Sequence, residues 1–500
     1  MAGGLARLNA GAAAPSLPYA AAATITAAAS AAILLYLAAT GSIAGSPSSS
    51  SDEKEEEDDD RKGKSRRGNV IPSPLTTLGL PALTADERRA LPYPPDGLLP
   101  GARDVDSPYG SIRVYEWGPE DGAKVLLVHG ISTPCVALAG VAEELVRRGR
   151  RVLLFDLFGR GLSSTPSDLP HDSRLYTTQI LLALASSPLA WTGRRSSSPS
   201  SSSTSSDNNN TTTTFSIVGY SLGGGIAADF ASYYFLHHPT GGGGGGLRVS
   251  SLVLIAPGGV LRRDRVSWTS WLLYDVLGAT LPFSSWLLKW LVARRLHTPV
   301  DDDDDADDDD ADDAADAVAA DADPGDATQA EAGLGKRRLK RGGSMASHPA
   351  PLFPDRGPAL RHVTAAAAVN WQIANHEGFV VPAFVSSMRW APIYGQWGRW
   401  RVVGERVRAK AVEAAAARER EGGIGGAGSG ERGEEGVLLV LGRHDPIVTV
   451  DEVGRDAVEA LGGPRNVRTV VLDAGHEVPM SMPREVVDAM VEFWEARDET

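Results

Sequence analysis

The sequence contains a single cysteine, Cys135, among 500 residues. One cysteine excludes an internal disulfide and any metal site built from cysteines alone. We find no nucleotide-binding motif and no metal-ligand spacing, so the sequence predicts neither a cofactor nor a metal. It also lacks an excess of charge outside one segment. Residues 301–326 hold 15 Asp and no Lys, Arg or Glu, and removing them takes the net charge from −14 to +1. A nearly neutral remainder gives no electrostatic case for nucleic-acid binding.

Much of the chain has too little variety to build a hydrophobic core. The low-complexity stretches are residues 45–68, 193–214, 241–246, 301–326 and 421–435. They predict a core in two parts, with a helical cap inserted between them. The predicted division is 1–68 (Ala-rich apolar segment and charged linker), 69–260 (first part of the core, with a disordered insert at 193–214), 261–403 (cap, with a disordered acidic insert at 301–345), 404–435 (helix and Gly-rich linker) and 436–500 (last part of the core).

The N-terminal region has no charged residue between Leu8 and Ser51. Its Ala-rich part, residues 19–44, is long enough to span a bilayer, which takes about 20 residues. We expect a protein associated with a membrane through this segment. A cleaved signal or transit peptide, which would give a secretory or organellar protein, and a disordered tail on a soluble cytoplasmic protein remain open.

Short apolar runs alternate with helical patterns through the core. The runs predict buried parallel strands at residues 125–128, 152–155, 215–218, 252–256, 437–441 and 467–472, and the alternation at 112–117 predicts an edge hairpin strand. Helices are expected at 136–148, 173–187, around 451–461 and at 483–495. This order predicts an α/β protein with a doubly wound, mostly parallel sheet.

The stretch between Ala256 and Val437 has no strand periodicity. Residues 266–296 and 365–400 are rich in Trp and Leu, which predicts two helical blocks that form the cap. These aromatic side chains either pack the cap onto the core and one another, or present part of its surface to a lipophilic substrate or a bilayer.

The sequence Gly219-Tyr220-Ser221-Leu222-Gly223 follows an apolar run and precedes a helical pattern. A strand that turns directly into a helix strains the serine backbone and exposes its hydroxyl group. A Cβ atom at position 219 or 223 would press on the neighbouring strand or helix, so both positions require glycine. The pattern predicts a nucleophilic serine at Ser221.

A nucleophilic serine needs a base, and the base needs a group that orients it. Asp445 comes just after the predicted strand at 437–441, and His476 just after the strand at 467–472. Parallel strands gather their functional groups at their carboxyl ends, so we expect these residues to meet Ser221. Asp473 is an alternative orienting acid, because it is also close to His476 in the sequence.

Five motifs in this order resemble the α/β-hydrolase superfamily: His129-Gly130, Phe155 to Ser163, Gly219 to Gly224, Gly442 to Asp445, and Gly475-His476. The cap stretch 371–396 is similar to that of capped serine hydrolases of fungal type. The resemblance implies Ser221 as nucleophile, His476 as general base and then acid, and Asp445 as orienting acid. It also implies an oxyanion hole formed by the N–H groups of Leu222 and Ile131. Ile131 lies in a loop shaped by His129 and Gly130.

A serine at the nucleophile position resembles the esterase, lipase and C–C hydrolase branches of the superfamily. The expected function is hydrolysis of a small lipophilic ester or thioester through an acyl-enzyme. C–C bond hydrolysis or acyl transfer on the same fold remains open. So does a catalytically silent protein that binds a lipid or partner at a membrane, through residues 19–44 and the Trp-rich cap.

Overall fold

The computed structural model describes residues 69–191, 214–235, 247–266, 268–278, 286–296, 350–353, 356, 360–420 and 436–495. The predicted membrane segment at 19–44 and the acidic insert at 301–345 lie outside these residues, and so do 193–213 and 421–435. Among the helices in the described ranges, none is both long and apolar enough to cross a membrane.

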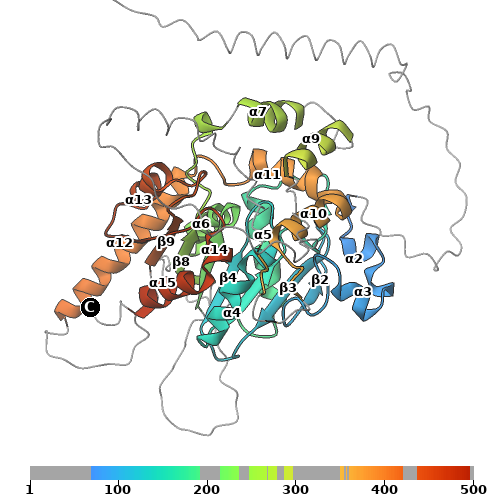
Figure 1. Cartoon of the computed structure of the whole chain (residues 1–500). Coiled ribbons are helices and arrows are strands. Elements are labelled where there is room, and N and C mark those ends of the chain that lie inside the picture. The colour runs from blue at the N-terminus through green and yellow to red at the C-terminus, as the bar shows by residue number, and fades with distance from the viewer. Residues whose placement is uncertain are drawn as a thin grey trace, which may run out of the picture. The chain divides into compact units, whose positions relative to one another are not determined.

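One eight-stranded sheet forms the centre of the fold (Figure 1), in the order β10-β9-β8-β7-β4-β5-β3-β2. Its strands are β2 Arg103–Val105, β3 Ile112–Trp117, β4 Lys124–Val128, β5 Arg151–Phe155, β7 Thr214–Tyr220, β8 Arg248–Ile255, β9 Gly436–Gly442 and β10 Val467–Leu472. The six strands from β10 to β5 are parallel, and β3 and β2 continue the sheet antiparallel. This confirms the α/β fold class with a mostly parallel sheet.

Helices pack on the sheet and against one another, because their apolar faces must be covered. The core helices are α4 Ala139–Arg147, α5 Ser173–Ala185, α6 Leu222–Tyr234, α12 Trp397–Arg420, α13 Arg455–Ala460, α14 Val478–Ser481 and α15 Pro483–Glu495. α4 packs against α15, while α5 and α12 pack against α6. Helices therefore occur where the sequence predicted them, and α12 joins the core through its contact with α6.

The prediction of an edge strand at residues 112–117 is wrong. β3 lies between β5 and β2, and Ile112 to Glu116 are all buried. Its polar positions are covered through ion pairs: Arg113 Nη1 lies 2.9 Å from Asp104 Oδ2, and Glu116 Oε2 lies 2.8 Å from Arg103 Nη2. Both partners come from β2, so the apparent alternation of polar residues does not mark a solvated face.

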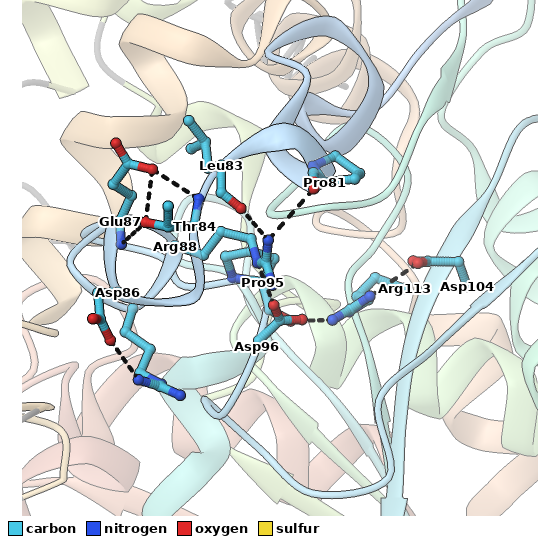
Figure 2. A network of polar contacts seen from close by, with 11 residues as sticks. Pro81, Leu83, Thr84, Asp86, Glu87, Arg88, Pro95, Asp96, Asp104 and Arg113 are labelled. Atoms are coloured by element: carbon cyan, nitrogen blue, oxygen red, sulfur yellow. Dashed lines mark hydrogen bonds and ion pairs between the residues drawn. The ribbon is translucent and has the colours of Figure 1, made fainter.

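The segment before β2 folds into short elements rather than one extended strand. It contains β1 Val70–Ile71, which pairs with β6 Thr165–Pro166, and the helical turns α2 Pro74–Thr77, η1 Leu80–Ala82 and α3 Ala85–Arg89. Figure 2 shows how polar contacts hold this region: Thr84 and Glu87 form a capping box on α3, and Arg88 contacts the Asp96 carboxylate. The segment also contacts the sheet directly, because Arg113 of β3 donates to the Pro95 carbonyl.

The cap between β8 and β9 is mostly helical in its described parts, with isolated β-bridges between Leu261 and Tyr394 and between Pro351 and Thr364. Its elements are α7 Trp268–Trp271, η4 Leu272–Leu277, α9 Trp286–Leu296, α10 Ala365–Asn375, η8 Phe379–Phe384 and α11 Val385–Trp390. Trp371 of α10 is buried, as packing of the cap on the core requires, and so is Trp400 of the core helix α12. Five other Trp side chains are between 44% and 74% exposed: Trp268, Trp271, Trp286, Trp290 and Trp390. Packing thus accounts for only part of the aromatic content.

Candidate active site

The turn from β7 into α6 holds Ser221 in a strained conformation. Its φ of 53° lies in the left-handed region that few residues other than glycine adopt, at a cost of about 1–3 kcal/mol. A Cβ atom on Gly219 would lie 2.2 Å from the Gly223 carbonyl oxygen, and one on Gly223 would lie 2.1 Å from the Val128 carbonyl oxygen. The close approach predicted at both glycines is therefore present, and it leaves the turn no room to relax.

Ser221, His476 and Asp445 lie together at the carboxyl ends of β7, β10 and β9. His476 Nε2 is 3.0 Å from Ser221 Oγ, and His476 Nδ1 is 2.7 Å from Asp445 Oδ2. All three side chains are buried. An ionised carboxylate can only accept, so Nδ1 carries the proton and Nε2 is free to accept one from the serine.

Asp445 is held as an oriented anion. Its Oδ1 accepts the backbone N–H groups of Ile447 and Val448, at 2.8 and 2.9 Å. Burial alone would raise the pKa of this carboxyl group, but the hydrogen bonds from His476 and from the two N–H groups outweigh burial and lower the pKa below its ordinary value. The carboxylate is therefore ionised at neutral pH and can stabilise a protonated imidazole.

Asp473, the alternative acid, does not contact His476. Its side chain is 76% exposed, and its Oδ1 lies 2.8 Å from Nε2 of His444. A residue three positions before the histidine points away from it at this strand end, so in this structure Asp445, and not Asp473, contacts His476.

Leu222 follows Ser221 directly, and Ile131 follows Gly130, which packs against Ser221. Leu222 begins α6, where N–H groups have no acceptor within the helix. A Cβ atom on Gly130 would lie 3.3 Å from Ser221 Cβ, so the loop that carries Ile131 runs directly beside the serine. Both residues are buried, and neither N–H has a hydrogen-bond acceptor within the described part of the chain. Such groups are available for an oxyanion.

His129 has a structural place in that loop. Its Nδ1 bonds to the Gly130 carbonyl oxygen at 2.8 Å, and its Nε2 accepts the Leu157 N–H at 2.9 Å. Burial, and secondly the positive charge of Arg160, lower the pKa of His129 to about 3. A neutral histidine with both nitrogens engaged in hydrogen bonds cannot act as a base at this site.

Two other polar residues near the site are also structural. The Asp156 carboxylate is buried and accepts the N–H groups of Cys135 and Leu162 and the Tyr93 hydroxyl, at 2.9–3.0 Å. Burial, and then the charge of Asp156, raise the pKa of the Cys135 thiol, so this thiol is not a nucleophile. In the described ranges no group of three or more His, Cys, Asp and Glu side chains is placed to hold a metal ion.

Sequence analysis missed two residues, Arg160 and Gln372, that contact the loop beside Ser221. Arg160 Nε lies 3.1 Å from the Ile131 carbonyl oxygen, and Gln372 Nε2 donates to the Ser132 carbonyl oxygen. A charged residue between Gly159 and Gly161 was a usable signal for Arg160. Nothing in the sequence pointed to Gln372, which comes from the cap.

We expect stability to fall as the pH drops below about 6.5, the ordinary histidine pKa. Burial lowers the pKa of His129 to about 3 and of His376 to about 4, and that of His171 well below its ordinary value. The unfolded chain then binds protons that the folded chain rejects, which costs on the order of 2 kcal/mol per imidazole at pH 5. Urea unfolding between pH 7.5 and 4.5 measures this. His376→Gln should flatten the pH dependence, whereas His444→Gln, at an exposed position, should not.

Comparisons with known proteins find similar solved structures but no matching family or sequence. Neither a family model nor a curated protein sequence matches the chain. A carboxylesterase from the thaumarchaeon Nitrososphaera gargenis is 12% identical over 79% of this chain and 99% of its own, with a TM-score of 0.42. A Bacillus subtilis carboxylesterase is 14% identical (82% and 96% covered, TM-score 0.42), and a bacterial membrane phospholipase A is 16% identical (85% and 93% covered, TM-score 0.43). Similarities this low say nothing about substrate.

The strand order, the strained serine between β7 and α6, and the bonded set of Ser221, His476 and Asp445 identify an α/β-hydrolase fold.

Proposed function

We propose that this protein is a serine hydrolase that cleaves the ester or thioester bond of a small apolar acyl substrate. The observation that carries the proposal is the continuous hydrogen-bonded chain from Ser221 Oγ through His476 to Asp445, at 3.0 and 2.7 Å. An oriented base within reach of a strained serine is the arrangement that activates a hydroxyl group for acyl transfer.

The reaction follows from this geometry. Ser221 Oγ attacks the acyl carbon while its proton passes to His476 Nε2, and the negative charge on the former carbonyl oxygen is bound by the N–H groups of Leu222 and Ile131. His476 then returns the proton to the departing alcohol or thiol, which leaves an acyl-enzyme. A water molecule attacks this ester with His476 again as the base, and the carboxylic acid departs.

The surroundings of the serine favour an apolar acyl group. Ser221 itself is only 7% exposed, and the side chains of its flanking residues Leu222 and Ile131 are buried and apolar. A polar acyl chain would lose its hydration there without compensation. The Trp- and Leu-rich cap lies over the same part of the chain, since Gln372 of α10 contacts the Ser132 carbonyl.

The test is hydrolysis of 4-nitrophenyl esters and acyl thioesters of increasing chain length by the full chain, combined with fluorophosphonate labelling. We expect turnover that improves from two-carbon to longer acyl groups, and a label on Ser221. A chain that neither turns over these substrates nor takes up the label is a silent scaffold, and the proposal is then wrong.

We further propose that the cap associates with a membrane surface. Trp268, Trp286 and Trp390 are 72%, 74% and 54% exposed. The guanidinium groups of Arg294 and Arg389 lie 5.3 and 5.1 Å from the ring centres of Trp290 and Trp390. Exposed Trp beside Arg is the composition of segments that lie in the headgroup region of a bilayer.

Replacing both Trp286 and Trp290 with serine should lower hydrolysis of a vesicle-embedded ester about tenfold or more, because the apolar area that partitions into the bilayer is lost. Hydrolysis of soluble 4-nitrophenyl butanoate should stay within about twofold. Tyr233→Ser is the matched control, since Tyr233 is 51% exposed on α6, outside the cap. Equal losses on both substrates would contradict a membrane-facing cap.

A further inference from the structure

Three consecutive backbone carbonyls beside Ser221 are held by three different side chains. His129 Nδ1 contacts the Gly130 oxygen at 2.8 Å, Arg160 Nε donates to the Ile131 oxygen at 3.1 Å, and Gln372 Nε2 donates to the Ser132 oxygen. These side chains come from the end of β4, the loop after β5 and the cap helix α10. The loop that carries the Ile131 N–H is thus fixed from outside at every carbonyl.

Arg160 is fully buried, and it forms no ion pair with an Asp or Glu side chain in the described part of the chain. All its nitrogens donate to neutral oxygens. Nη1 reaches the Phe158 carbonyl and the Tyr176 hydroxyl, and Nη2 reaches Ser387 Oγ at 2.8 Å and the Ala383 carbonyl at 3.4 Å. Burying an unpaired cation is costly, so a role in stability alone does not explain it.

Gln372 ties the cap to the same loop with a fixed orientation. Its Oε1 accepts the Gly161 N–H at 3.1 Å, which directs Nε2 towards the Ser132 carbonyl. The side chain is fully buried, and both ends of its amide are satisfied. Neighbouring contacts strengthen the buried seam between the cap and the core. His376 Nε2 lies 2.8 Å from the Ser163 carbonyl oxygen, and the Tyr176 hydroxyl oxygen lies 2.7 Å from Ser387 Oγ.

We propose that Arg160 and Gln372 are positioning residues that hold the Ile131 N–H towards the reacting oxygen. The block from α10 to α11 is then a fixed part of the oxyanion hole and not a removable cover. The Ile131 N–H shares a peptide plane with the Gly130 carbonyl, which His129 contacts. Arg160 and Gln372 hold the carbonyls of the next two planes, so the backbone at Ile131 is restrained on both sides and cannot shift away from the reacting oxygen. This inference rests on the proposed hydrolase function.

The experiment compares Gln372→Met and Arg160→Lys with Ser386→Ala in the full chain, using 4-nitrophenyl butanoate. Methionine keeps the length of the Gln372 side chain and removes both hydrogen bonds. Lysine keeps the positive charge of Arg160 but lacks the planar guanidinium group, whose N–H groups donate in several fixed directions. Ser386 belongs to the same buried seam, where its Oγ accepts the His171 N–H at 2.9 Å, but it does not contact the loop. It therefore controls for loosening of the cap.

We expect kcat to fall about 10- to 100-fold in Gln372→Met and Arg160→Lys, with KM within about threefold. Binding of a trifluoromethyl ketone, which forms the oxyanion, should weaken by the same factor. Ser386→Ala should keep kcat within about twofold. If Gln372→Met misfolds, Gln372→Glu is the substitute, because it retains the acceptor for Gly161 and loses the donor to Ser132.

Unchanged kcat and ketone binding in folded Gln372 and Arg160 variants would overturn this inference and leave the hydrolase proposal intact. The same holds if Ser386→Ala loses as much activity as they do. A wild-type chain that neither hydrolyses the ester nor reacts with a fluorophosphonate would instead remove the proposed function, and this inference with it.

Discussion

Replacing Ser221 with alanine should reduce kcat for ester hydrolysis by about 10⁴- to 10⁶-fold, because the attacking atom itself is removed. The residual rate would come from the oxyanion hole and from substrate binding. The same variant should lose fluorophosphonate labelling completely. Both are measured on the purified full chain with 4-nitrophenyl butanoate, in single-turnover and steady-state assays.

Ser216→Ala is the matched control for this result. Ser216 is buried on the same strand, β7, where its hydroxyl group accepts a hydrogen bond from Ser251 at 2.7 Å, remote from the catalytic set. Its replacement should leave kcat within about twofold. A Ser221→Ala variant that keeps more than a tenth of the wild-type rate would refute Ser221 as nucleophile, because a different group would then have to attack the acyl carbon.

The candidate triad could be predicted because each of its residues stands in a recognisable local sequence pattern. Ser221 stands in a glycine-flanked turn, and Asp445 and His476 each follow directly after an apolar strand. A parallel sheet then brings the three residues together, because the carboxyl ends of its strands lie at one edge regardless of the segments that connect the strands.

The position of residues 112–117 could not be predicted in this way. This segment contains the charged residues Arg113 and Glu116, which lie on opposite faces of the strand and in isolation indicate solvent exposure. Burial of both depends on partners elsewhere, Asp104 for Arg113 and Arg103 and Arg151 for Glu116. Ion pairing across strands is a tertiary property and leaves no period in the sequence.

The cap poses the same difficulty for apolar residues. In α9, Leu288, Val292 and Leu296 follow one another at four-residue intervals and are buried, whereas Trp286 and Trp290 follow the same interval on another face and are exposed. Two stripes with one period cannot be told apart until it is known which one meets the core. Sequence reasoning could therefore find the cap but not its outward face.

Replacing Asp445 with asparagine should lower kcat about 10⁴-fold at neutral pH. An asparagine amide that donates to His476 Nδ1 forces the ring proton onto Nε2, so the nitrogen facing Ser221 becomes a donor and can no longer take the serine proton. Shape is nearly conserved, which separates the electronic effect from a packing defect. Steady-state kinetics of the purified variant measure it.

Asp473→Asn is the counterpart that makes this result specific. Asp473 precedes the same histidine by three residues and also accepts from an imidazole, that of His444, at 2.8 Å, but at an exposed position. Its replacement should leave kcat within about twofold. If Asp473→Asn instead cost more activity than Asp445→Asn, the carboxylate that orients His476 during turnover would be Asp473. The 2.7 Å contact between Asp445 and His476 would then belong to a resting arrangement only.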